Sequence, residues 1–328
     1  MAARILLAEG AGRETSLRAV CKELELGGIV ALPTETVYGL AGDALNAEAA
    51  ARIFEAKERP FFDPLICHIP DLDWLERITA VPLALQPLVA RLATSFWPGP
   101  LTLVLPKRTC IPDLVSSGLP TVAVRWSAHP LFQEVLTRFN RPLAAPSANK
   151  FGRISPTTAA HVFEELGGRI PLILEGGPAL HGLESTIVAP TERGLRILRS
   201  GPITQEQLEA YAPVYKNEGP LAEEGRPEAP GQLKSHYAPR TPLFLFATGE
   251  TPPPEERAGL LAWQNSPLGF GALEVLSPSG ELREGAARLF AALRRLDEAG
   301  MDRIYAELAP PLGLGIAIND RLQRAAAR

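Results

Sequence analysis

Short apolar runs alternate with helical patterns through the first two hundred residues of this chain, and that alternation restricts it to folds that mix helices with a sheet. Asn46 can cap one of the predicted helices, and Ser155-Pro156 can begin another. The pattern predicts an α/β domain with a twisted mixed sheet. Strands are predicted at 28–33, 65–69, 101–105, 121–125, 142–145, 172–174, 186–189 and 195–198, and helices at 46–57, 83–96, 131–139 and 157–166, with a further helix that ends near Gly27.

Residues 212–242 interrupt this pattern, because they contain six prolines and little periodicity. The composition is typical of a linker, although unstructured loops of this length are usually either functional or disordered. Beyond it, the order of elements favours a small Rossmann-like α/β domain with a parallel sheet. We therefore expect a first domain at 1–211, a linker at 212–242 and a second domain at 243–328. The second domain is predicted to have strands at 243–246, 272–276 and 303–307 and helices at 254–263, 282–296 and 318–327.

The charge of the chain argues against a nucleic-acid scaffold, since 33 Lys and Arg stand against 37 Asp and Glu. A protein that holds a duplex by its phosphates usually has a basic surplus, so strong direct nucleic-acid binding is not expected. Neither a signal-peptide pattern nor a run of about 20 apolar residues occurs, so no membrane segment is expected. Three widely spaced cysteines fit a reducing compartment and predict a cytoplasmic location.

The familiar catalytic motifs are missing from the sequence. It has no Walker loop and no dinucleotide-binding glycine pattern, and its histidines lack metal-ligand spacing with each other or with cysteine. No protein metal site is therefore predicted. Any site has to be assembled from short polar segments, such as the one with Thr34 that follows the first strand, where a side chain can face a crevice of an open sheet.

Four basic or titratable positions allow either a structural or a functional interpretation. Lys57 and Arg59 end a predicted helix, where they can satisfy its last carbonyls or clamp a triphosphate, and we expect both to be partly exposed. Arg125 ends an apolar strand and needs a carboxylate partner, either from the fold or from a ligand. His68 lies within a strand pattern, where a lone histidine is more often structural. The serines of the polar loops are, taken singly, more often caps or turn residues.

Ten short motifs in one order resemble the threonylcarbamoyl-AMP synthase family in its long form, a YrdC-like domain followed by a smaller one. Each motif is weak alone, but their order is specific. Three departures concern loop detail: Ser200 stands where the family usually has proline, Asp63 where asparagine is common, and Cys67 where a β-branched residue is usual. The motifs lie at 33–40, 57–60, 64–68, 97–102, 121–125, 145–149, 155–157, 184–187, 198–201, and 230–231 with 236–239.

The resemblance implies an L-threonylcarbamoyladenylate synthase, a nucleotidyltransferase. Threonine and bicarbonate or CO2 would give a carbamate, which attacks the α-phosphate of ATP, with Mg2+ accompanying the nucleotide. A downstream transferase would place the product on tRNA, and the loop with His236-Tyr237 would fold over the nucleotide. Lys57 and Arg59 would be catalytic. By the resemblance, the ATP-binding residues would be Lys57, Arg59, Thr121, Ser147, Asn149, Ser155, Arg199, His236 and Tyr237, and the threonine-binding residues Thr34, His68, Arg125, Ala145 and Ser185.

The principal alternative is an RNA-binding module of the YrdC-like fold without catalysis, because the pathway ends on tRNA. The net acidity argues against it. A different carbamoyl or adenylyl transferase would carry zinc-finger and acylphosphatase-like regions that this sequence lacks, and a non-catalytic regulator would lack the Lys57 and Arg59 pair.

Overall fold

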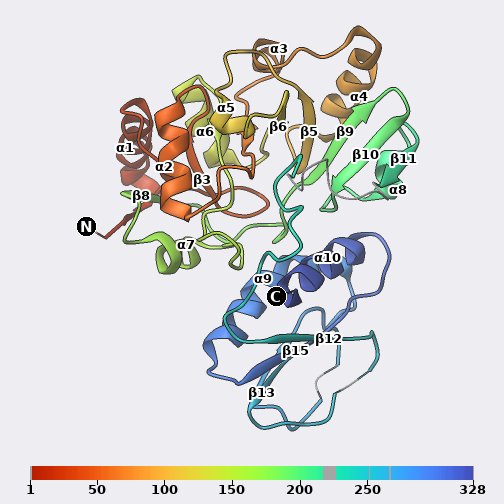
Figure 1. Ribbon diagram of the computed structural model, residues 1–328. Coiled ribbons are helices and arrows are strands. Elements are labelled where there is room, and N and C mark those ends of the chain that lie inside the picture. Colours follow the sequence, from red (N-terminus) through yellow and green to blue (C-terminus); the bar gives the residue numbers. More distant parts are fainter. Residues whose placement is uncertain (1, 217–226, 251, 266, 328) are drawn as a thin grey trace.

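The computed structural model describes residues 2–216, 227–250, 252–265 and 267–327. Within these residues a large sheet occupies the first two-thirds of the chain and a small sheet the last third (Figure 1). Strand β4 pairs with β6 in parallel, whereas β5 pairs with β6 in antiparallel fashion, so the predicted mixed sheet is confirmed. In sheet order, the strands are β1 (Arg4–Leu7), β8 (Leu172–Glu175), β2 (Val30–Leu32), β3 (Gly39–Asp43), β7 (Leu143–Ala144), β4 (Ile66–His68), β6 (Thr121–Arg125), β5 (Leu101–Pro106), β9 (Thr186–Thr191), β10 (Gly194–Arg199) and β11 (Val214–Lys216).

Helices cover both faces of the large sheet, as the side chains of β2 illustrate. Val30 and Leu32 pack in one apolar cluster with α1 and α6, whereas Ala31 between them packs in another with α2. Successive side chains of a strand point to opposite faces, so each face has its own core. Asn46 caps α2 as predicted. The helices are α1 (Arg13–Glu25), α2 (Ala47–Lys57), α3 (Asp73–Ile78), α4 (Gln86–Phe96), α5 (Asp113–Ser116), α6 (Pro130–Phe139), α7 (Ala159–Leu166) and α8 (Gln205–Glu209), with short 3-10 turns at Gly10–Gly12 and Leu83–Leu85.

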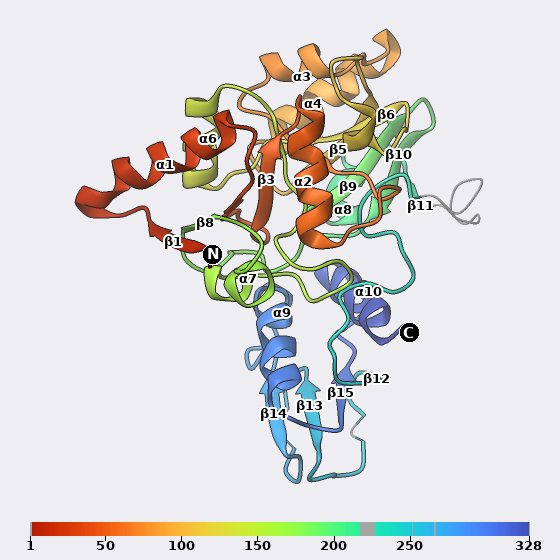
Figure 2. The same cartoon turned by 60° about the vertical axis from the view of Figure 1, so that its left-hand side comes forward.

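The C-terminal unit is a small parallel sheet covered by two helices. Its strand order is β12-β15-β13-β14, and every neighbouring pair is parallel, as predicted. In both views α9 and α10 lie between this sheet and the large unit (Figure 1 and Figure 2). No described helix has the length and apolar character needed to cross a membrane. The elements are β12 (Leu243–Phe246), β13 (Ala258–Ala262), β14 (Ala272–Val275), α9 (Leu282–Glu298), β15 (Arg303–Glu307) and α10 (Leu314–Ala326).

Two expectations about local structure are wrong. The helix predicted at 254–263 is strand β13, whose five residues are all buried. A strand buried on both faces is uniformly apolar, so its pattern does not separate it from a buried helix. The helix predicted at 157–166 begins at Ala159 and is capped by Thr158, which accepts a hydrogen bond from the backbone of His161, so Ser155-Pro156 does not start it.

The segment expected to be a linker contributes one strand to the large sheet. β11 lies within 212–242 and pairs in parallel with β10. Residues 217–226 of the same segment lie outside the described residues. From residue 227 onward the segment returns to the large unit, and Arg153 forms an isolated bridge with Ala238. This return brings the loop that carries His236 and Tyr237 against the strand ends of the large sheet.

Candidate active site

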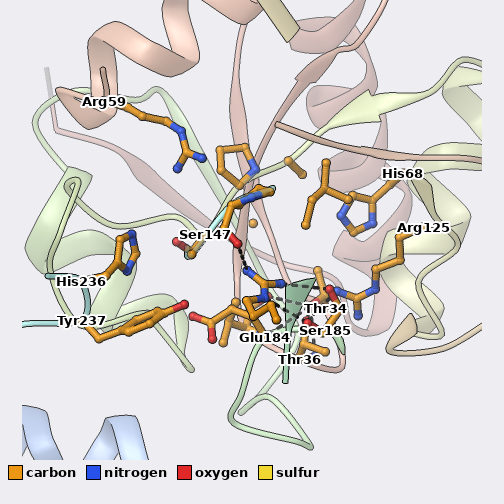
Figure 3. A pocket seen from close by; sticks show the side chains of 18 residues that line it. Thr34, Thr36, Arg59, His68, Arg125, Ser147, Glu184, Ser185, His236 and Tyr237 are labelled. Carbon is orange, nitrogen blue, oxygen red and sulfur yellow. Dashed lines mark hydrogen bonds between the residues drawn. The ribbon is translucent and has the colours of Figure 1, made fainter. Parts of the chain in front are cut away.

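A pocket lies where strand ends of the large sheet meet the loop that carries residues 230–237 (Figure 3). The side chains that line it come from segments far apart in the sequence: the last residues of β4, β6 and β10, the loops after β2, α2 and β7, and the segment before β9. Most of the predicted site residues converge here. They are Thr34, Arg59, His68, Arg125, Ala145, Ser147, Ser185, Arg199, His236 and Tyr237.

Lys57 lies behind the pocket wall and does not line it. Its side chain is buried, with 1% exposure, so the expectation of partial exposure is wrong. Nζ donates to the backbone carbonyls of Ser147 at 2.5 Å and Asn149 at 2.6 Å. Burial, with a further contribution from Arg59, lowers the pKa of Lys57 well below its ordinary value. Lys57 therefore holds the loop after β7 in place.

Arg59 is buried as well, at 7% exposure, but it does line the pocket. Nε donates to the carbonyl of Asp63 at 3.0 Å, and Nη2 donates to the carbonyl of Pro64 at 2.8 Å. Nη2 also pairs with a carboxylate oxygen of Asp63 at 2.9 Å, and the guanidinium lies 5.9 Å from the ring centroid of Phe151. These contacts fix the guanidinium before any ligand arrives.

Arg125 finds its carboxylate partner within the fold. Nη2 pairs with Glu35 at 2.6 Å, Nη1 donates to the hydroxyl of Thr36 at 2.9 Å, and Nε donates to the carbonyl of Gly99 at 3.2 Å. Although burial opposes ionisation, Arg125 and Ser127 lower the pKa of Glu35 to about 2. A guanidinium carries five N–H donors, so two of those of Arg125 have no partner among the described residues.

Arg199 has a different set of partners. It donates hydrogen bonds to the carbonyl of Ser185 at 3.1 Å, the hydroxyl of Ser185 at 3.1 Å and the carbonyl of Pro230 at 3.3 Å. All of these acceptors are neutral, so Arg199 offers a positive charge to the pocket. Ser185 is held from its other side by the hydroxyl of Thr102 at 2.7 Å.

The remaining predicted residues do not line the pocket. Thr121 begins β6 and is partly exposed. Asn149 donates to the carbonyls of Lys150 and Arg153, both at 2.8 Å. Ser155 donates to the carboxylate of Glu184 at 2.5 Å, so it supports a pocket residue from behind.

Sequence reasoning missed several lining residues, among them Thr36, Glu184 and Gly231. All three lie within the motifs of the sequence analysis, and Thr36 and Glu184 lie within two residues of the predicted Thr34 and Ser185, which was the available signal. Gly231 has a φ of 83°, and a Cβ there would meet Tyr237 Oη at 2.8 Å. A left-handed glycine is therefore required for the close approach of this loop to Tyr237.

No cluster of three or more His, Cys, Asp or Glu side chains that could hold a metal ion occurs in the part of the chain that the structure describes. Glu184 is the one acidic side chain among the described residues that line the pocket, and both of its oxygens are already engaged, by Ser155 and Arg321. The charge of the pocket therefore comes mainly from Arg59, Arg125 and Arg199, which favour the binding of an anion.

His68 should make stability depend on pH between 6.5 and 5. Burial, helped by the charge of Arg125, lowers its pKa from 6.5 to about 3. Below pH 6.5 the unfolded chain gains a proton on this residue while the folded chain does not. The free energy of unfolding therefore decreases as the pH is lowered, by up to about 1.4 kcal/mol per pH unit. Glu35 contributes only below its ordinary pKa of 4.5.

Urea unfolding of the unaltered protein and of His68→Asn at pH 7, 6 and 5 measures this effect. The variant should have the shallower dependence of unfolding free energy on pH, because asparagine does not titrate. The comparison uses slopes and not absolute stabilities, since the substitution itself costs packing. Equal slopes for the two proteins would show that His68 does not carry the effect.

Two family models together cover most of the chain. One, described as "Telomere recombination", matches residues 22–201, and one described as "Threonylcarbamoyl-AMP synthase, C-terminal domain" matches residues 203–327. The chain is 41% identical to a threonylcarbamoyl-AMP synthase of Bacillus subtilis, over 91% of this chain and 89% of that protein. It is 38% identical to one of Pyrococcus abyssi, over 95% of this chain and 94% of that protein.

The fold resembles solved structures over nearly its whole length. A crystal structure of the Sua5 protein of Pyrococcus abyssi in complex with L-threonine aligns with a TM-score of 0.87 at 35% identity, covering 98% of this chain and 97% of that one. A further structure of the same protein, in which a histidine and a tyrosine are replaced by alanine, aligns with the same TM-score at 33% identity, over 99% of this chain and 96% of that one.

Proposed function

Because this chain belongs to the threonylcarbamoyl-AMP synthase family, we propose that the pocket of the large sheet holds ATP and L-threonine side by side. The chain is an enzyme that forms threonylcarbamoyl-AMP and pyrophosphate from L-threonine, bicarbonate or CO2, and ATP. This catalytic function is favoured over an RNA-binding module of the same fold. The site proposal depends on one observation, the convergence of Arg59, Arg125 and Arg199 on one pocket.

Threonine occupies the end of the pocket that Thr34, His68, Arg125, Ala145 and Ser185 line. His68 and Arg125 lie together on one side of the view in Figure 3, and Thr34 and Ser185 lie below them. The two N–H donors of Arg125 that no described residue accepts from suit a carboxylate, which can accept from arginine in a bidentate manner. The neutral His68 can exchange a hydrogen bond with the amine or hydroxyl of the amino acid without repelling the ammonium form.

The nucleotide occupies the other end. Arg59, His236 and Tyr237 lie together there in Figure 3, and Ser147 lies between the two ends. Arg59 and Arg199 supply charge to the phosphates. Three predicted residues support the pocket without lining it: Lys57 donates to the carbonyls of Ser147 and Asn149, and Ser155 donates to Glu184. Only the family likeness places Thr121 in the site. Lys57 thus serves the clamp indirectly.

The chemistry needs no protein nucleophile. The threonine nitrogen attacks CO2, forming an N–C bond and releasing a proton, and a carbamate oxygen then attacks the α-phosphorus of ATP. The bond from that phosphorus to its bridging oxygen breaks, and pyrophosphate leaves with the electron pair. Positioning and charge neutralisation are the main requirements of such a transfer. Arginines held in place by Asp63 and Ser185 satisfy them without reorganising during the reaction.

The loop with His236 and Tyr237 excludes water, which would otherwise hydrolyse the mixed anhydride. Both side chains are buried, and the ring of His236 contacts the rings of Phe151 and Tyr237. We assign 1–211 to the catalytic domain, 212–242 to the linker and 243–328 to the small domain, with β11 as a linker strand added to the catalytic sheet. The product passes to a transferase that modifies tRNA, and three free cysteines support a cytoplasmic location.

The function is tested by incubating the protein with L-threonine, bicarbonate and ATP. Pyrophosphate should appear only when all three are present, together with a product of the mass of threonylcarbamoyl-AMP. Release of pyrophosphate without threonine would instead indicate a plain ATP pyrophosphohydrolase. Filter binding of tRNA over a range of salt concentrations tests the RNA-binding alternative, which requires a steep fall of affinity with salt.

Removal of divalent cations should abolish turnover and leave threonine binding intact. Mg2+ belongs to the substrate here, as MgATP, because Glu184, the one acidic residue that lines the pocket in the described part of the chain, is already paired with Arg321. The prediction is checked by two measurements in the presence of excess chelator: pyrophosphate release, which should stop and resume on adding Mg2+, and threonine affinity by calorimetry. A threonine affinity that falls with the chelator would point to a protein-held metal.

A further inference from the structure

Arg321 extends from the C-terminal unit to the wall of the pocket. It lies on α10, its side chain has 0% exposure, and it is the largest fully buried side chain of the described residues. Nε donates to Glu184 at 2.9 Å, Nη2 donates to the carbonyl of Ser200 at 2.9 Å, and Nη1 donates to the neighbouring Asp320 at 2.6 Å. The guanidinium also lies 5.2 Å from the ring centroid of Tyr237. One side chain of the small unit therefore contacts the pocket wall and the loop that covers it.

The contact between Arg321 and Glu184 is an ion pair, so it affects the charge of the pocket. Burial opposes its ionisation, but Arg321, Arg199 and the hydroxyl of Ser155 together lower its pKa, so it is a carboxylate at neutral pH. It is the single acidic side chain among the described residues that line the pocket. A carboxylate beside a triphosphate repels it unless a cation neutralises the charge, and in a buried site water screens that repulsion little.

We propose that Arg321 is a positioning residue for the nucleotide: it neutralises Glu184, supports the ring of Tyr237, and so completes the pocket only when α10 is docked on the large unit. This inference rests on the proposed function of the pocket. By this proposal the small domain contributes to ATP binding through the side chain of Arg321. Arg321 does not line the pocket itself, so it acts through Glu184 and Tyr237.

A purely mechanical role in docking is the competing explanation, and the chain offers a matched control for it. Arg294 on α9 is likewise buried, at 6% exposure, and crosses the same interface. Its partners are the carbonyl of Ile154 and the carboxylates of Glu165 and Glu164, and none of these residues lines the pocket. Loss of Arg294 weakens docking without leaving a charge beside the nucleotide.

The first experiment compares Arg321→Met with Arg294→Met. We expect Arg321→Met to raise the KM for ATP on the order of a hundredfold, because it leaves a buried carboxylate unpaired in an anion site, while threonine affinity changes little. Arg294→Met should lower the melting temperature and leave the KM for ATP close to that of the unaltered enzyme. Equal rises of the KM for ATP in the two variants would reduce Arg321 to a docking residue and overturn the proposal.

The second experiment tests the charge itself. In Glu184→Gln/Arg321→Met the pocket wall carries no unpaired carboxylate, and Asp320, the other partner of Arg321, keeps its ion pair with Arg324 at 3.0 Å. The KM for ATP should therefore recover by at least about tenfold relative to Arg321→Met. Arg321→Lys, which keeps the charge, should retain more ATP affinity than Arg321→Met and guards against a variant that fails to fold. Additive losses in the double variant would overturn the inference.

The outcomes separate this inference from the proposed function. If the unaltered enzyme makes threonylcarbamoyl-AMP and loses activity on Arg59→Ala, the site assignment stands whatever Arg321 does. If Arg321→Met and Arg321→Lys then bind ATP as the unaltered enzyme does, the inference alone is wrong. Absence of threonine-dependent product from the unaltered enzyme would remove the function on which the inference rests.

Discussion

Arg59→Ala should lower the rate of threonylcarbamoyl-AMP formation by at least about a thousandfold. Removing one fixed donor that is aimed at developing charge commonly costs a hundredfold to a thousandfold, and Arg59 is in addition one of only a few cations that face the proposed phosphate end. The measurement is threonine-dependent pyrophosphate release at saturating ATP. A variant that retains most of its activity would contradict the clamp assignment.

The same substitution should also destabilise the fold, which complicates the interpretation of an inactive variant. Asp63 has 0% exposure, and its carboxylate would lose the guanidinium that neutralises it. Breaking a buried ion pair from one side typically costs about 3–5 kcal/mol. The double variant Arg59→Ala/Asp63→Asn removes the unpaired carboxylate, so it should recover much of the unfolding free energy and remain inactive. Recovery of activity together with stability would show that Arg59 is structural.

The convergence of the site was predictable because its residues follow strand ends. Polar side chains at or just after the ends of apolar strands, such as Arg125 and Thr34, are brought to one edge wherever the strands share a sheet. The large mixed sheet was likewise readable from alternating apolar and helical patterns. These patterns do not show whether a buried charge pairs with a residue of the fold or with a ligand. Arg125 needed a carboxylate, and only the fold reveals that Glu35 supplies it.

Contacts between distant segments were the part that sequence reasoning could not supply. Arg321 lies far along the chain from Glu184, in a helix whose apolar pattern is ordinary, so nothing in its local sequence marks it as a pocket support. The strand β13 was missed for a related reason. Its burial depends in part on α9, whose Leu296 lies 3.2 Å from the position that a Cβ of Gly259 would occupy. Tertiary packing, and not local propensity, decides such a segment.

Lys57→Met should lose stability and activity together, which separates an indirect role from direct contact with phosphate. The Nζ atom satisfies the carbonyls of Ser147 and Asn149, and each buried carbonyl left without a donor costs about 1–3 kcal/mol. We therefore expect unfolding free energy to fall by roughly 2–4 kcal/mol and the loop with Ser147 to lose its position, with a large rise in the KM for ATP. Urea unfolding and steady-state kinetics measure the two effects.

Lys150→Met is the matched control, because it removes a neighbouring positive charge from the same loop, whereas the loop carbonyls that Lys57 holds belong to other residues. It should change stability by less than about 1 kcal/mol and leave the KM for ATP nearly unchanged. A direct phosphate contact by Lys57 predicts the opposite signature in Lys57→Met, a raised KM for ATP with unfolding free energy intact. The two signatures differ because a lysine that donates its hydrogen bonds to backbone carbonyls stabilises the protein without ligand. A lysine that contacts only phosphate stabilises the complex with ATP and not the free protein.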